Sequence, residues 1–360
     1  MKMKNNKKKD NHNTTTQKKR KYCIALILLI LALFTSIIFS IMLGPVEIHP
    51  FTTIGIFLNK LGLIESNWSQ TTEIIVTDIR APRVLVAALV GAGLAIAGAA
   101  MQGLFKNPMA EPYVLGMSSG AAVGAALVIV LGVGVGTFGA LSIQVMAFFG
   151  ALGTILIVYG VARAEGKTPV ETLLLAGIAM GAFLYSVVSS LKFIASDEAL
   201  RDIVLWLMGS FSMAQWNDLY LITLLILIGI LGLYAFSREL NAMQFGEETA
   251  MYLGVKVETV KKIILIFAAL ITATGVSHAG IIGFVGLIIP HVVRILIGAD
   301  HHILLPASAL MGAIFLILAD TLARTIAAPA EIPVGIITAF VGAPYFIYLL
   351  RRKKKTMSWW

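Results

Sequence analysis

The residues of this chain that could do chemistry are few and scattered. Its six histidines fall in different loops and segments, and no cysteine or carboxylate joins them at the spacing of a metal site. They are His12, His49, His278, His291, His301 and His302. Cys23 is the one cysteine, so the chain cannot form an internal disulfide. We therefore expect no metal site, and histidines that act as isolated polar groups.

Residues 160–168 (GVARAEGKT) are similar to a phosphate-binding loop but depart from its pattern. That motif has Gly, four residues and then Gly-Lys-Ser/Thr, and it follows a strand. Here five residues separate Gly160 from Gly166, and a long apolar segment precedes them. We reject the motif and find no catalytic dyad. The chain is therefore predicted to bind no nucleotide or cofactor of its own, to have no catalytic residues and not to be an enzyme.

Charged residues inside apolar segments are costly and usually functional, and this chain has almost none. Asp320 and Arg324 have i, i+4 spacing, so they could pair within one helix, or Arg324 could face a soluble partner. Arg80 and Arg83 precede another apolar segment. An ion-coupled carrier is expected to bury ionisable relays at mid-membrane. Their absence predicts an external energy source, with an ion-coupled secondary transporter as the alternative.

The elements that must position these residues are membrane-spanning helices. The 360 residues are 58% hydrophobic and only 13% charged, whereas a soluble domain has about 25% charged residues. In lipid every backbone group must pair internally, and the segments are too uniformly apolar for barrel strands. The fold class is thus all-α and polytopic, with about ten transmembrane helices. The expected spans are 22–43, 84–105, 113–133, 143–162, 170–191, 217–236, 263–280, 282–298, 303–323 and 332–350.

The basic residues set the predicted orientation. Nine Lys or Arg residues lie in 1–21 and five in 351–355, and with an even number of spans both tails lie on one side. With the tails in the cytoplasm, 22 of the 28 basic residues are inside, as the positive-inside rule requires. Basic tails beside spans favour an anionic lipid surface over nucleic acid. We expect cytoplasmic tails at 1–21 and 351–360 around a transmembrane domain at 22–350, in a prokaryotic cell (inner) membrane.

Small residues recur every fourth position in two of the spans. Gly116, Gly120 and Gly124 mark the third span, and Gly91 and Gly103 frame a similar stripe in the second. In lipid, helices associate through close backbone contact, so these glycines are predicted to pack helices. They could also frame a pathway. The stretch 275–290, rich in Gly and ending in Pro290, predicts short or broken helices.

The predicted cytoplasmic segment 237–262 is far longer than the 2–8 residues that usually connect helices. Residues 247–253 favour a helix that Gly254 ends, and 255–262 could begin another. A short charged helix with an apolar face can dock in the groove of a partner, although a solvated connector is the alternative. The residues assigned to this docking face are Glu247, Glu248, Ala250, Met251, Leu253 and Gly254.

Three long blocks of the chain resemble the permeases of ABC importers for iron chelates, haem and cobalamin. They are RAPR with GAGLAIAGAAMQGLFKNPMAEPYVLGMSSGAAVG (80–83 and 91–124), GFVGLIIPHVVRILIGADHHILLPASALMGAIFLILADTLAR (283–324) and EIPVGIITAFVGAPYFIYLLRR (331–352). The resemblance covers about residues 20–352. It implies a permease subunit with ten helices that takes up a metal chelate.

The same resemblance implies the partners and the roles of several residues. It implies a second permease (an identical copy or a paralogue), two cytoplasmic ATPases that carry ATP and magnesium, and an external substrate-binding protein. Residues 247–254 would contact the ATPase. Arg80 and Arg324, with Arg83 beside them, would contact acidic residues of the binding protein. The helix around Gly177 and Gly181 and the last helix would line the path. The cargo stays open among siderophore, haem and cobalamin.

Overall fold

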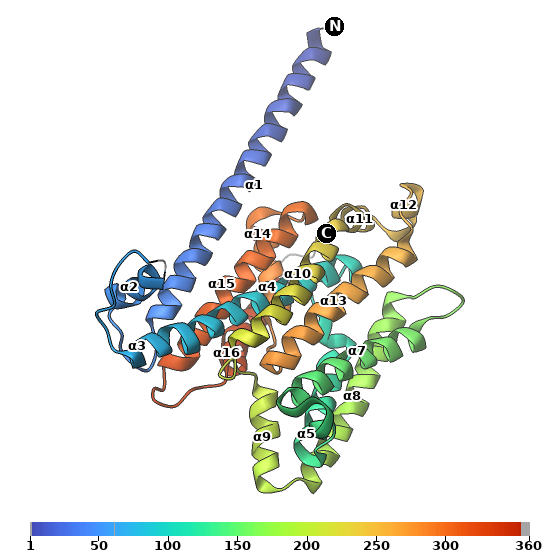
Figure 1. Ribbon diagram of the computed structural model, residues 1–360. Coiled ribbons are helices and arrows are strands. Elements are labelled where there is room, and N and C mark those ends of the chain that lie inside the picture. Colours follow the sequence, from blue (N-terminus) through green and yellow to red (C-terminus); the bar gives the residue numbers. More distant parts are fainter. Residues whose placement is uncertain (1, 61, 354–360) are drawn as a thin grey trace.

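The computed structural model describes residues 2–60 and 62–353, and every regular element in these ranges is helical (Figure 1). The remaining residues of the predicted C-terminal tail, 354–360, lie outside the described part. The long helices are α1 (Lys2–Met42), α4 (Ala81–Phe105), α5 (Met117–Leu131), α7 (Ser142–Ala162), α8 (Val170–Ile194), α10 (Trp216–Ala235), α13 (Val257–Ala279), α14 (Val285–Ile297), α15 (His301–Thr325) and α16 (Val334–Lys353). The shorter ones are α2 (Pro50–Lys60), α3 (Gln70–Ile74), η1 (Ile75–Arg80), η2 (Pro112–Leu115), α6 (Val135–Phe138), η3 (Gly139–Leu141), α9 (Asp197–Met208), α11 (Ser237–Met243) and α12 (Glu247–Tyr252).

Each expected span falls on one of the long helices. Seven helices of the described chain are long and apolar enough to cross a membrane, and α5, α14 and α16 are shorter apolar helices. Helix α1 runs without a break from Lys2 through the described part of the basic segment, so the structure shows no boundary between that tail and the first span. Helix α13 begins at Val257, six residues before the expected start. Helix α5 begins at Met117 because a 3₁₀ turn occupies 112–115.

The helices define two ends of the molecule (Figure 1). The N-terminus of α1 lies at one end together with α11 and α12, which we call the α12 end. The opposite end carries α2, α3 and α9, and we call it the α2 end. These two ends hold most of the polar clusters described below.

Helix α4 is the centre of the bundle and is buried along almost its whole length. Its glycines let neighbouring backbones approach. A Cβ on Gly91 would overlap the carbonyl of Gly312 on α15, and a Cβ on Gly98 would overlap the backbone of Gly286 on α14. Where helices touch through backbone atoms, any side chain larger than hydrogen would separate them.

A second crossing of the same kind joins α5 to α7. A Cβ on Gly120 would overlap the Gly150 carbonyl and the Thr154 side chain, and a Cβ on Gly124 would overlap the Met146 carbonyl. Gly116 lies just before α5 with φ of 81°, a conformation that favours glycine. The glycine stripes of the second and third predicted spans therefore lie at helix crossings.

The stretch 275–290 contains a break, as expected. Helix α13 ends at Ala279, residues 280–284 are not helical, and α14 begins at Val285 and contains Pro290. Gly280 and Phe284 have φ of 68° and 70°, so the backbone on both sides of this break is left-handed. A non-glycine residue in this region marks a backbone held by its surroundings.

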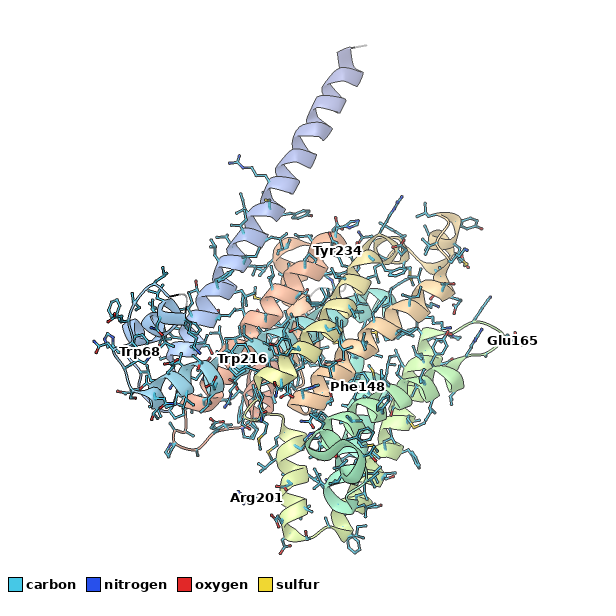
Figure 2. All side chains as sticks on the ribbon, viewed as in Figure 1. Trp68, Phe148, Glu165, Arg201, Trp216 and Tyr234 are labelled. Carbon is cyan, nitrogen blue, oxygen red and sulfur yellow. The ribbon has the colours of Figure 1, made fainter. Side chains whose placement is uncertain are left out.

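A π-helical turn, η1, precedes α4 and joins it to α3. The indole Nε1 of Trp216, the first residue of α10, donates a hydrogen bond of 2.9 Å to the carbonyl of Thr77 in this turn (Figure 2). π-Helical turns widen a helix and are frequent at functional sites. Arg80 is the last residue of this turn and Arg83 lies in the first turn of α4, so the turn positions both side chains.

The crossing of α5 and α7 provides a matched test of close packing. Gly150→Val should lower the stability of the protein by about 1–3 kcal/mol, because the new side chain would meet the Gly120 carbonyl. Gly153→Val on the same helix should be close to neutral, because no atom lies within 4 Å of its Cβ position. Thermal unfolding in detergent measures both variants. Equal loss of stability in the two would contradict the role of Gly150 in packing.

Candidate functional site

Helix α12 carries exposed apolar side chains at the α12 end. Phe245, Met251, Tyr252 and Leu253 are 75%, 55%, 92% and 67% exposed, and we call these four the α12 patch. Ala250 is fully buried, so it packs inward although it was expected on the docking face. Phe245 and Tyr252 were missed, although aromatic residues flanking a short helix are typical of contact surfaces. An apolar patch outside the long apolar helices indicates a contact with another protein.

The backbone fixes the shape of this segment. Helix α12 ends at Tyr252, and Gly254 follows with φ of 87°. The Val255 amide donates to the Ala250 carbonyl, which closes the turn and satisfies a helix-end carbonyl. The predicted helix at 247–253, its stop at Gly254 and a new helix within 255–262 are confirmed.

Lys261 of α13 holds α12 in place. Its ammonium group lies 2.8 Å from Glu247 of α12 and 3.0 Å from Glu258, and it donates to the Thr168 carbonyl at 3.3 Å. Glu258 in turn accepts from the Thr168 amide at 2.9 Å. The side chain of Lys261 is only 5% exposed, while both carboxylates are more than one-third exposed. One lysine therefore connects α12, α13 and the loop between α7 and α8.

A second polar cluster connects α11 to the start of α15. The Asn241 amide group donates to Asp300 at 2.7 Å, and its oxygen accepts from the His301 amide at 2.8 Å. Gln244 donates to the Ala299 carbonyl at 3.0 Å. Partial burial opposes ionisation of Asp300, but the hydrogen bonds from Asn241 and from the His302 amide leave the pKa of Asp300 below its usual value. This cluster fixes α11 against α15.

The His301 ring also explains one of the stripe glycines. It is fully buried, and a Cβ on Gly103 would overlap its Nε2 atom. Gly103 thus makes room for a polar ring beneath the C-terminal part of α4. Gly103 therefore differs from Gly91 and Gly98, because it makes room for a side chain and they make room for a neighbouring backbone.

At the α2 end, an ion cluster joins α4, α15 and the loop before α16. Arg83 forms an ion pair of 2.9 Å with Asp320 and one of 2.8 Å with Glu331. Arg324 lies 3.4 Å from Asp320 and donates to the Ser40 carbonyl at 2.7 Å. Arg83, Asp320 and Arg324 are buried, whereas the side chain of Glu331 is 37% exposed.

Arg80 caps the end of α1. Its guanidinium group donates to the carbonyls of Ile41, Met42 and Val46. A cation at a helix C-terminus satisfies free carbonyls and complements the helix dipole. The sequence pattern gave no signal for this contact, because it joins residues about 40 positions apart.

Arg80, Arg83 and Arg324, which the resemblance assigns to binding-protein docking, are buried in the structure described here, and their docking role stays a prediction. All three are at most 5% exposed, and their donors bind groups of the same chain. The i, i+4 pair of Asp320 with Arg324, one of the two readings of that spacing, does form. A buried guanidinium group needs such partners because an unpaired buried charge is very costly. Any docking role must therefore act through this cluster.

Gly177 and Gly181 of α8 face other parts of the same chain. A Cβ on Gly177 would lie 2.7 Å from the Leu115 Cα, and one on Gly181 would lie 3.7 Å from the Gly116 Cα. They let α8 approach the start of α5. The exposed face of α8 carries larger side chains instead, among them Leu175, Phe183 and Tyr185. That Gly177 and Gly181 line a path stays a prediction.

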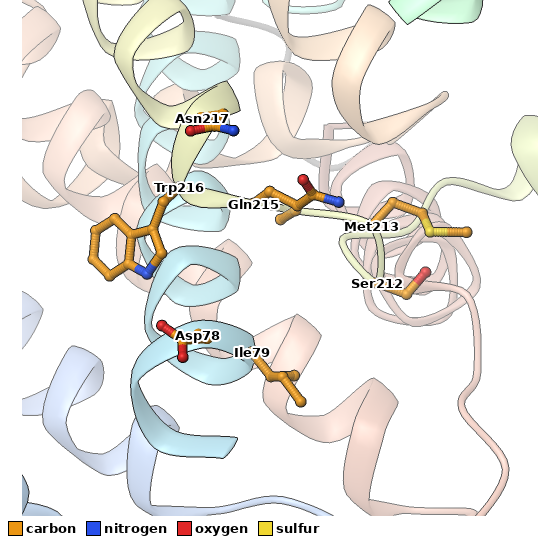
Figure 3. Close-up of a pocket in the computed structure, with 8 residues that line it drawn as sticks. Asp78, Ile79, Ser212, Met213, Gln215, Trp216 and Asn217 are labelled. Carbon is orange, nitrogen blue, oxygen red and sulfur yellow. The ribbon is translucent and has the colours of Figure 1, made fainter. Parts of the chain in front are cut away.

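Two cavities open at the α2 end. One of about 500 Å³ is lined by Asp78 and Ile79 of η1 and by residues 212–217 (Figure 3). The other, of about 560 Å³, lies among α7, α9, α10 and α13. Both have Ser212, Met213 and Gln215 in their walls, so the loop before α10 separates them.

The long apolar helices are typical of a membrane protein. An exposed patch at one end and cavities at the other are the features that a transport subunit needs. The model of the FecCD transport family matches residues 28–352. The chain belongs to the FecCD transport family. It is therefore a multi-pass membrane permease of the metal-chelate importer family and not an enzyme.

Named relatives and a solved structure agree with this assignment. The cobalamin import system permease protein BtuC of Halobacterium salinarum is 47% identical over 79% of this chain and 75% of its own length. The hemin transport system permease protein HmuU of Yersinia pestis is 47% identical over 78% of this chain and 84% of its own. A metal-chelate type ABC transporter solved in an inward-facing conformation is 32% identical, with a TM-score of 0.79, and the match covers 91% of this chain and 98% of that chain.

The Lys261 cluster provides a test of how α12 is held. Lys261→Met should leave Glu247 and Glu258 repelling each other and remove the cation that binds the Thr168 carbonyl. Losing charged hydrogen bonds of this kind costs about 1.5 kcal/mol, so amides of residues 247–254 should exchange with deuterium roughly tenfold faster. Lys262→Met, which changes an exposed lysine beside it, should leave exchange unchanged. Equal exchange in wild type and Lys261→Met would refute the role of this lysine.

Proposed function

We propose that this chain is the membrane-spanning permease subunit of an ATP-driven importer that takes up a metal chelate delivered by an external binding protein. Two cytoplasmic ATPase subunits, which hold ATP and magnesium, and a second permease subunit complete the transporter. Ten helices cross the membrane, and the α12 end, with both chain termini, lies in the cytoplasm. The second permease is an identical copy or a paralogue. The chain itself binds no cofactor.

The α12 patch carries this proposal. Its four apolar side chains are exposed at the α12 end, on and beside a short helix that lies outside the long apolar helices. Glu247 and Glu248 flank the patch, and charged residues around an apolar centre are typical of protein interfaces. An ATPase subunit whose groove accepts a short helix would bury these side chains. The family to which the chain belongs supports the same partner.

The polar clusters offer a route for the motion of the ATPase. Lys261 connects α12 to the loop that begins α8, and Asn241 connects α11 to α15. When the ATPase moves α12, helices α8 and α15 would move with it. Movement of α8 and α15 would then open the path to one side at a time. ATP binding shifts this equilibrium only if the ATPase holds α12 differently in the two states.

The outer mouth would receive the binding protein through the ion cluster. Glu331 is the exposed member of that cluster and it binds Arg83 from the surface side. An acidic residue of the binding protein could replace Glu331 on Arg83, which would keep the buried arginine paired while water solvates the displaced, partly exposed Glu331. This proposal keeps Arg80, Arg83 and Arg324 as the docking residues, with exposure created only on docking.

An ion-coupled secondary transporter is the alternative. A feature that could favour it is Asp320, a carboxylate inside an apolar helix. However, Asp320 forms ion pairs with Arg83 and Arg324, so guanidinium groups of the same chain occupy this carboxylate. In this arrangement Asp320 serves to join α4 and α15.

Purification of the tagged chain from its own membranes, with mass spectrometry of its partners, tests the proposal. An ATPase should co-purify at one copy per permease. Leu253→Asp should weaken that association roughly thirtyfold, which is about 2 kcal/mol, because it places a charge in the buried contact. Leu63→Asp at the α2 end, where the side chain is similarly exposed, should have no effect. An intact permease without ATPase, and uptake abolished by collapse of the ion gradient, would favour the secondary transporter.

Glu331→Gln tests the proposed exchange at the outer mouth. Removing this internal carboxylate should free Arg83 for a carboxylate of the binding protein, so docking should tighten severalfold. Glu65→Gln changes an exposed acid at the same end and should leave docking unchanged. Surface plasmon resonance on the purified transporter measures both. Weaker docking by Glu331→Gln would argue that Glu331 itself contacts the partner.

A further inference from the structure

The two cavities at the α2 end form a vestibule that has no assigned ligand. We define the vestibule by the walls of both cavities, which meet at Ser212, Met213 and Gln215. Its combined space, about 500 and 560 Å³, lies in the range of small-molecule sites. Helix α9, the loop 209–215 and the ends of α10 and α13 surround it.

The charge of the vestibule is one-sided. Asp202 and Asp218 line the larger cavity and Asp78 lines the smaller, while the described residues lining either cavity include no lysine or arginine. Arg201 lies next to Asp202 on α9, but it is exposed and outside the lining (Figure 2).

The other arginines of this end do not balance these carboxylates. Arg83 and Arg324 pair with the carboxylates of the ion cluster, and Arg80 binds carbonyls at the end of α1. The vestibule therefore has a negative field, which its low-dielectric walls strengthen.

The walls offer hydrogen-bond acceptors as well as donors to a ligand, because serine and glutamine side chains accompany the aspartates and His278. His278 lines the larger cavity, and its Nδ1 atom lies 3.0 Å from the Thr274 carbonyl. A carbonyl can only accept, so Nδ1 carries the hydrogen and Nε2 of the neutral ring is an acceptor. Trp206 and Met213 add apolar surface, and Met213 is 81% exposed. This combination suits a ligand with apolar faces and hydrogen-bond donors.

We propose that the vestibule is a cargo-contact site that admits metal chelates of neutral or positive net charge and disfavours anionic ones. This inference rests on the proposed importer function and names its cargo class. A cationic chelate gains from the three carboxylates, a neutral chelate is neither attracted nor repelled by their charge, and a polycarboxylate chelate is repelled by them. A hydroxamate chelate of ferric iron, neutral or with a free ammonium group, has the required chemistry, and a citrate chelate does not.

Thiol chemistry measures the field directly and does not depend on transport. In a Cys23→Ser background, Met213→Cys places a thiol in the vestibule and Asn67→Cys places one in an exposed loop of the same end. Each is treated in neutral detergent with a trimethylammonium and a sulfonate methanethiosulfonate reagent. The ratio of the two rates cancels the pKa of the thiol. We expect the cation-to-anion ratio to be at least about fivefold higher at Met213→Cys.

Charge variants link this ratio to the carboxylates. Asp202→Asn with Asp218→Asn should bring the ratio close to that of the loop thiol, and asparagine can still accept the Gln215 amide hydrogen bond that Asp218 accepts. Glu198→Gln, an exposed acid on α9 outside the lining, is the control and should leave the ratio unchanged. Equal ratios at the two thiols, or a ratio insensitive to the aspartate variants, would overturn the inference.

Uptake by the whole transporter in proteoliposomes then tests selection. The probes are ferrioxamine B (cationic), ferrichrome (neutral) and ferric citrate (anionic), each at saturating binding protein. We expect the double aspartate variant to lower uptake of the cationic chelate several-fold and to leave the neutral one unchanged. Uptake of ferric citrate at the rate of the hydroxamates would overturn the charge selection alone. Absence of ATP-driven uptake for all three, without an associated ATPase, would count against the proposed function instead.

Discussion

Close contact between backbones at glycine is the constraint on which the rest of this structure depends. In a bilayer the lipid tails are as apolar as leucine, so helices gain little from burying apolar side chains against each other. Gly91 against Gly312 and Gly98 against Gly286 bring α15 and α14 onto α4 at backbone distance. Dispersion contacts then accumulate over the whole crossing. The polar clusters at the two ends can form only because this centre fixes where α4, α14 and α15 begin and end.

The two ends use charge differently. At the α12 end, Lys261 is buried but its carboxylate partners reach water, so loosening the cluster would leave the lysine without its partners but neither carboxylate buried and unpaired. At the α2 end, Arg83, Asp320 and Arg324 are all buried, and Glu331 is the member of the cluster that reaches the surface. A buried triad of this kind resists rearrangement, because moving one member away would leave the others as buried charges without a partner. This arrangement suits an α12 end that moves with a partner. It also suits an α2 end that stays fixed until a carboxylate of a partner takes the place of Glu331.

The sequence predicts what depends on local pattern. Apolar length located all of the long helices, Gly254 marked the end of α12, and the glycine-rich stretch before Pro290 located the break at 280–284. What it missed depends on contacts between distant residues. Nothing near Lys261 in the sequence indicates Thr168, and nothing near Arg80 indicates the end of α1. The burial of the three arginines, and the inward turn of Ala250, follow from such contacts.

These distant contacts also bear on the cargo. Because Arg83 and Arg324 pair with carboxylates of their own chain, those two arginines add little positive field to the space beside α9. From the sequence alone, Arg80, Arg83 and Arg324 would make that end basic. In the folded chain two of the three are paired with Asp320 and Glu331, and Asp78, Asp202 and Asp218 are the charged residues that line the space a ligand meets. The ion cluster that stabilises the mouth thus also leaves the vestibule acidic.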